Sequence, residues 1–242
     1  MTGTGVARAM TPRIVAWAGH GFGVLIFVQN LLLQAGAPSF DAPAAEISAH
    51  YAEHAARLTV AVSLAPVSLL LLLAFVIGTT SWTPAPTPAA MAWGRLGIAG
   101  AVLTAAMFAV AASLQIGMLA LAGPGTDTSL VRALWVLHAA TVALTPTFLA
   151  ALLLGASRAV HAGGSAPWWS TATATAGAAA FVLAAILAGA AAHGGPAALV
   201  GLLGVAALVL WMVTTANHLS RASRRGGPER RHASPGRISS VS

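Results

Sequence analysis

The chain of 242 residues contains no cysteine and no lysine, and only 7% of its residues are charged. Without cysteine it can form no disulfide, thiolate zinc site or iron–sulfur cluster, and it has no thiol nucleophile. So few charged residues cannot cover the surface of a soluble protein of this length. These absences exclude a soluble globular fold and several common kinds of redox and covalent chemistry.

Apolar residues make up 57% of the sequence and are concentrated in long runs separated by short loops. Each run supplies the ~20 residues that a helix needs to cross ~30 Å of hydrocarbon, and a helix satisfies its own backbone there. The sequence therefore predicts an all-α, polytopic membrane protein with six transmembrane helices. The predicted spans are residues 14–34, 58–78, 96–121, 130–154, 170–192 and 197–216.

Arginine is distributed unevenly around these spans. Ten of the twelve arginines lie in the two tails and in the loops after the second and fourth spans. Because arginine close to a span resists translocation, we predict that both termini are cytoplasmic and that the other loops face outward. Only Arg57 and Arg132 fall on the outward side. Arginine in place of lysine, with abundant alanine and glycine, is typical of GC-rich bacterial genes, so the predicted location is the bacterial cytoplasmic membrane.

These assignments divide the chain into three parts. Residues 1–13 are predicted to form a cytoplasmic tail, residues 14–220 the transmembrane domain, and residues 221–242 a disordered, arginine-rich cytoplasmic tail. The simplest interpretation of that tail is a topology anchor near anionic lipid, not a nucleic-acid site. In an alternative, the first span is a signal peptide that ends in Ala35-Gly36-Ala37, and its removal would leave the orientation unchanged.

The first outward loop contains polar residues at helical spacing. Glu46, His50 and His54 recur on one face, and residues 50–54 match the H-x-x-E-H pattern of inverted zinc peptidases. The short loops offer no domain that could bury a peptide. We therefore predict a solvated polar face on a short helix, about residues 41–57, that lies at the outer interface. No metal or cofactor is predicted, and these three side chains are the weak candidates for metal ligands, which Asp127 or His193 could approach from other outward loops.

Polar residues inside the spans are costly in lipid and usually face the interior of the bundle. Five of them fall in the outward half of the predicted helices: Gln29, Asn30, Ser63, Gln115 and His138. Their shared depth predicts an outward-facing polar cavity. The alternative is hydrogen bonding between helices, which contributes ~0.6 kcal/mol on average for each pair.

Other chemistry finds little support in the spans. A haem needs two axial ligands at one depth, whereas His20 and His138 fall in opposite halves of the bundle. Pro66 and Pro146 could bend their helices as hinges, but no internal repeat of the kind found in transporters is visible. The spans contain no acidic residue for a proton relay or for acid–base catalysis, so we expect no enzymatic activity.

Three stretches carry a resemblance to a known family. They are the outward segment at residues 41–54, the sequence Arg132-Ala-Leu-Trp135, and the sequence Ala166-Pro-Trp-Trp169. In these the chain resembles a large group of small six-helix bacterial membrane proteins that share a domain of unknown function, although Trp168 stands where that family usually has arginine. The resemblance implies the fold but no activity and no site residues.

The combined prediction is a non-enzymatic accessory or transport protein that interacts with lipid or with a small molecule. The alternatives are a small efflux or resistance permease and a haem or quinone redox subunit. Expected partners are membrane lipids and a hydrophobic small molecule. A second copy of the chain or another membrane protein is a further expected partner, because glycine-lined helix faces suit contacts within or between chains.

Overall fold

The computed structural model describes residues 10–81, 87–122, 127–164, 166–191 and 197–225. These residues form α-helices and no strand. Six of the helices are long and apolar enough to cross a membrane, so the predicted fold class is confirmed. In chain order the helices are α1 (Pro12–Gln34), α2 (Ala44–Glu53), α3 (Ala55–Ser81), α4 (Pro88–Leu121), α5 (Thr128–Ala162), α6 (Trp168–Ile186), α7 (Ala188–Ala191) and α8 (Ala197–Arg225).

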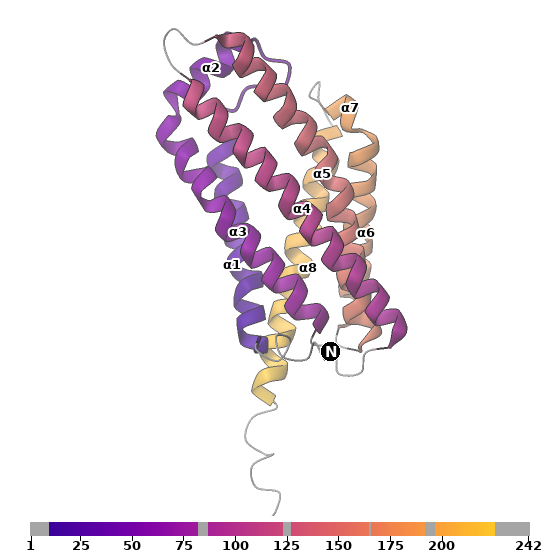
Figure 1. The fold of residues 1–242 in the computed structure, drawn as a ribbon. Coiled ribbons are helices and arrows are strands. Elements are labelled where there is room, and N and C mark those ends of the chain that lie inside the picture. Colours follow the sequence, from indigo (N-terminus) through magenta and orange to yellow (C-terminus); the bar gives the residue numbers. More distant parts are fainter. Residues whose placement is uncertain (1–9, 82–86, 123–126, 165, 192–196, 226–242) are drawn as a thin grey trace, which may run out of the picture.

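The six long helices form a ring (Figure 1). Each packs against the long helix before it and the one after it, and α8 closes the ring by packing on α1. The start of α1 and the end of α8 lie at one end of the bundle, which we call the terminal end. Helix α2 lies at the opposite end, which we call the α2 end. Which end faces the cytoplasm remains a prediction from the arginine distribution.

Large apolar side chains fill the interior of the ring. Phe75, Leu152, Phe181, Trp211 and Met212, from four of the long helices, have at most 1% of their surface exposed and belong to one contiguous core. The rings of Phe75 and Trp211 meet edge to face at 5.7 Å. Many apolar side chains on the outside of the bundle are exposed instead, as expected for a surface that faces lipid.

Glycine brings α4 and α5 into direct contact. A Cβ atom placed on Gly97 would lie 2.6 Å from the backbone nitrogen of Ala156, and one on Gly100 or Gly155 would also meet the backbone of the other helix. Real Cβ atoms do not approach so closely, so only glycine fits at these three positions. Small residues commonly allow membrane helices to approach in this way.

Several helix ends differ from the prediction. Helix α4 begins eight positions earlier than expected, at Pro88, because the Thr87 hydroxyl accepts a bond from the Ala90 N–H at 3.1 Å and proline suits the first turn. The span predicted at residues 170–192 is interrupted at Leu187. Helix α8 continues to Arg225, past the predicted start of the tail, and residues 226–242 lie outside the described residues.

Helix α2 packs on one end of the bundle. It lies across the ends of α3, α4 and α5, and it begins after Pro43 without a side-chain cap. Its apolar residues Ile47 and Tyr51 are buried in a second core with Met118 and Trp135. Its apolar face is therefore covered by protein, and its position at the lipid interface stays a prediction.

Candidate functional site

The structure divides the five residues of the predicted outward cavity into two groups. Gln29, Gln115 and His138 are buried, each at most 9% exposed. His138 Nδ1 lies 3.3 Å from the carbonyl oxygen of Ala111 and donates to it, which joins α5 to α4. This bond is of the kind expected from the alternative interpretation, in which polar residues hold helices together.

Asn30 and Ser63 lie on the outside of the bundle and do not join the other three. Both side chains are exposed. Asn30 Nδ2 donates to the carbonyl of Ile26, and Ser63 Oγ donates to that of Thr59, both at 2.8 Å within the same helix. A polar side chain whose donor is satisfied by its own helix can face lipid at low cost. The depth of these residues was therefore a poor guide to the direction in which they face.

Aromatic and imidazole rings form a continuous chain at the α2 end. Trp135 stacks on His138 with centroids 5.8 Å apart and contacts Tyr51 edge to face at 6.2 Å. Tyr51 contacts His50 at 5.9 Å, and His50 contacts His54 at 4.8 Å. The indole N–H of Trp135 is buried and has no hydrogen-bond partner in the described part of the chain.

The three weak metal candidates do not share one environment. Glu46 is exposed, His50 is buried and His54 is half-buried. The described residues contain no group of three or more histidine, aspartate or glutamate side chains placed to hold a metal ion. Burial lowers the pKa of His50, and the nearby His54 and Arg57 lower it further, while Glu53 opposes them. The environment of His50, which contacts the ring of Tyr51, therefore favours its neutral form.

The two arginines that depart from the charge asymmetry bind backbone carbonyls at the α2 end. Arg132 donates from Nη1 to the carbonyls of Phe40 and Ala42, at 3.1 and 2.6 Å. Arg57 donates from Nη2 to the carbonyl of Ala35 at 2.6 Å. Each cation therefore ties the segment between α1 and α2 to the bundle, which is a structural reason for arginine on that side.

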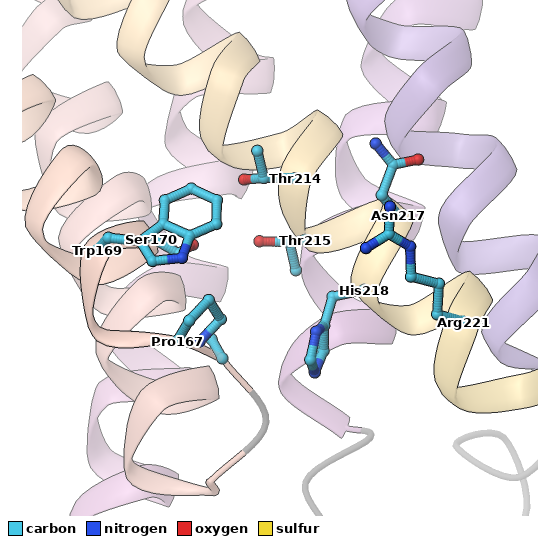
Figure 2. Close-up of a pocket in the computed structure, with 9 residues that line it drawn as sticks. Pro167, Trp169, Ser170, Thr214, Thr215, Asn217, His218 and Arg221 are labelled. Atoms are coloured by element: carbon cyan, nitrogen blue, oxygen red, sulfur yellow. The ribbon is translucent and has the colours of Figure 1, made fainter. Parts of the chain in front are cut away.

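A pocket that the sequence did not indicate lies at the terminal end (Figure 2). It has a volume of about 240 Å³ and lies between the start of α6 and the end of α8. Apolar, hydroxyl and cationic groups share its wall. The lining residues are Ala166, Pro167, Trp169, Ser170, Thr214, Thr215, Asn217, His218 and Arg221.

Two hydroxyl groups in this pocket are buried and unpaired. Ser170 and Thr215 are 2% and 4% exposed, and neither hydroxyl has a hydrogen-bond partner among the described residues. Figure 2 shows them on facing helices, with the Thr215 oxygen directed towards α6. Their neighbours are already engaged: Thr214 donates to the carbonyl of Leu210 at 2.8 Å, and the Asn217 amide oxygen lies 3.2 Å from a ring nitrogen of another helix.

That ring nitrogen belongs to His20 of α1. His20 Nδ1 donates to the carbonyl of Ala16 at 2.8 Å, and Nε2 faces Asn217 of α8 at 3.2 Å. His20 therefore joins α1 to α8, whereas His138 joins α5 to α4. The two histidines bind different helix pairs and form no axial pair for a haem.

One sequence signal pointed to the pocket but was interpreted differently. Thr214, His218 and Arg221 recur at the spacing of one helix face. Of these three, only Arg221 was given a role, as the first residue of the tail that was interpreted as a topology anchor. Only the packing of α6 against α8 brings Ser170 to this face.

Comparison with family models, with curated proteins and with solved structures found no match to the chain. The resemblance to the six-helix bacterial family therefore stays a prediction, and the six long apolar helices agree with a small membrane protein.

Proposed function

We propose that the protein is a non-enzymatic accessory protein of the bacterial cytoplasmic membrane that binds lipid. The observation that carries this proposal is the pocket at the terminal end, where unpaired hydroxyls and a cationic side chain meet at the edge of the bundle. Trp168 and Trp169 beside it are 74% and 44% exposed. Tryptophan is favoured at the level of the lipid head groups, so this pocket lies where head groups would reach it.

The filled interior favours this proposal over a permease. Phe75, Phe181 and Trp211 occupy the centre of the ring from three different helices, each at most 1% exposed. A route for a solute would have to displace them together. The contact of α4 with α5 through glycine gives these two helices little freedom to separate without losing many close contacts.

The test is native mass spectrometry of the full chain after gentle extraction, combined with flux measurements in proteoliposomes. We expect the polypeptide to retain lipid and to carry no chromophore. Substrate-dependent flux would overturn the proposal in favour of a permease, and an absorbing haem in favour of a redox subunit. A polypeptide that retains lipid of no class, from any membrane, would also overturn it.

A further inference from the structure

The pocket between α6 and α8 has the composition of an anion site. The first-turn N–H groups of a helix have no carbonyl of their own helix to bond, and they attract anions. At the terminal end, Thr11 and Thr87 cap α1 and α4 with their side-chain oxygens. Helix α6 instead follows Pro167, and within the described residues no side chain caps it. The Ser170 N–H donates to the carbonyl of Pro167 at 3.1 Å. The N–H groups of Trp168 and Trp169 are the first-turn donors left at the wall of the pocket.

The buried hydroxyls are the second and independent indication of a ligand. A buried hydroxyl without a partner is costly, by about 1 to 3 kcal/mol, and two that face one pocket are uncommon in a native structure. Ser170 contributes one from α6 and Thr215 the other from α8. A ligand that accepts hydrogen bonds would satisfy both. Both residues line this pocket.

A guanidinium and an imidazole group complete the set of donors. Arg221 and His218 line the pocket on the α8 side, opposite the start of α6 (Figure 2). Guanidinium groups bind phosphate oxygens through charge-assisted hydrogen bonds. No aspartate or glutamate lines the pocket, so nothing in its wall repels an anion. A group with several acceptor oxygens and a negative charge fits this arrangement.

We propose that this pocket binds a phosphate group, contacted by the hydroxyls of Ser170 and Thr215, the start of α6 and Arg221. The inference deepens the proposed function, on which it rests, by naming the chemical group that is recognised. The volume of about 240 Å³ is below the ~300–1,000 Å³ of typical sites for drug-sized molecules. It suits a head-group phosphate or inorganic phosphate.

The experiment compares the full chain with two variants. One is the double variant Ser170→Ala with Thr215→Val, and the other is Arg221→Gln. The matched control is Arg158→Gln, which removes an exposed arginine at the same end of the bundle but outside the pocket. Each protein is delipidated and placed in nanodiscs of phosphatidylcholine and phosphatidylglycerol, and the lipids retained by the protein are counted by native mass spectrometry. In a second arm, inorganic phosphate is titrated in detergent and the thermal midpoint is recorded.

We expect the full chain to retain phosphatidylglycerol in preference to phosphatidylcholine. Both pocket variants should lose roughly tenfold in that preference, equivalent to about one strong hydrogen bond, while Arg158→Gln keeps it. If phosphatidylglycerol shows no preference but inorganic phosphate raises the midpoint of the full chain and not of the variants, the phosphate comes from solution and the site stands.

Two results would overturn the inference. One is equal responses of the full chain and the double variant to both probes, and the other is a loss in Arg158→Gln as large as in Arg221→Gln. In either case retained lipid of any class would leave the proposed function in place. Failure to retain lipid at all would remove the proposed function instead, so the two failures are distinguishable.

Discussion

The arginine side chains at the two ends of the bundle differ in what they contact. At the α2 end, Arg132 and Arg57 donate to carbonyls of the segment between α1 and α2, so their hydrogen bonds hold the chain together. At the terminal end, Ser170 and Thr215 are buried without partners, beside the exposed Arg221. The position of an arginine at a span end therefore does not reveal its role. That role depends on whether the chain itself provides acceptors for its hydrogen bonds.

The largest expected effect contrasts the same substitution at the two ends. Arg132→Gln removes two hydrogen bonds from a charged donor, at 3.1 and 2.6 Å, and should lower the free energy of unfolding by about 2 kcal/mol. Arg221→Gln replaces an exposed side chain and should change the free energy of unfolding by no more than ~0.5 kcal/mol. Thermal unfolding in lipid-free detergent, followed by tryptophan fluorescence, measures both. Similar losses in the two variants would contradict the contrast between the ends.

A smaller effect should appear in the dependence of stability on pH. Burial, together with His54 and Arg57, lowers the pKa of His50 in the folded protein, while Glu53 acts in the opposite direction. The unfolded chain therefore binds a proton more readily than the folded one. Stability should be fully present above the ordinary pKa of about 6.5 and should decrease as the pH falls below it.

The variant that tests this effect is His50→Gln, measured by thermal midpoint between pH 7.5 and pH 5. It should show a weaker loss on acidification than the full chain does. His161→Gln controls for the loss of a histidine, because His161 is exposed at the terminal end. If the thermal midpoints of the full chain and of His50→Gln fall equally on acidification, the burial of His50 does not make the stability of the protein depend on pH.

The smallest expected effect on stability has the opposite sign. In lipid-free protein, Ser170→Ala with Thr215→Val removes two hydroxyls that form no hydrogen bond in the described residues. Stability should stay the same or rise by up to ~1 kcal/mol, because a buried unpaired polar group is costly. The matched change Thr145→Val removes a buried hydroxyl that bonds to the carbonyl of Thr141 at 2.8 Å and should be destabilising. A clear loss of stability in the double variant would mean that these hydroxyls have a structural role.

Much of the fold was accessible from the sequence because a helix in lipid must be long, apolar and internally hydrogen-bonded. The length of the apolar runs was therefore enough to predict the six spans. The direction in which a residue faces was not accessible. Gln29 and Asn30 are neighbours in the sequence, yet the first is buried and the second exposed, because successive residues on a helix point about 100° apart. Alanine on every face leaves no apolar stripe to fix that rotation.

The pocket could not be predicted, because it depends on which helices are neighbours. Ser170 and Thr215 are far apart in the chain and meet only where the start of α6 faces the end of α8. The residues that cover α2 could not be predicted for a related reason. Ile47 and Tyr51 form an apolar face whether it is covered by lipid or by protein, and only the packing beneath α2 shows that Met118 and Trp135 cover it.

The ring also has a consequence for biogenesis. Five of its six helix contacts join long helices that follow one another in the chain, and only the contact of α8 with α1 spans the whole sequence. His20 and Asn217, which meet across that contact, are 197 positions apart. Because a membrane protein is made from its N-terminus, the side of α1 that carries Gly23, next to Val209 and Val213 of α8, stays uncovered until α8 has been made. The helices made before α8 therefore form an open row, which α8 closes into a ring.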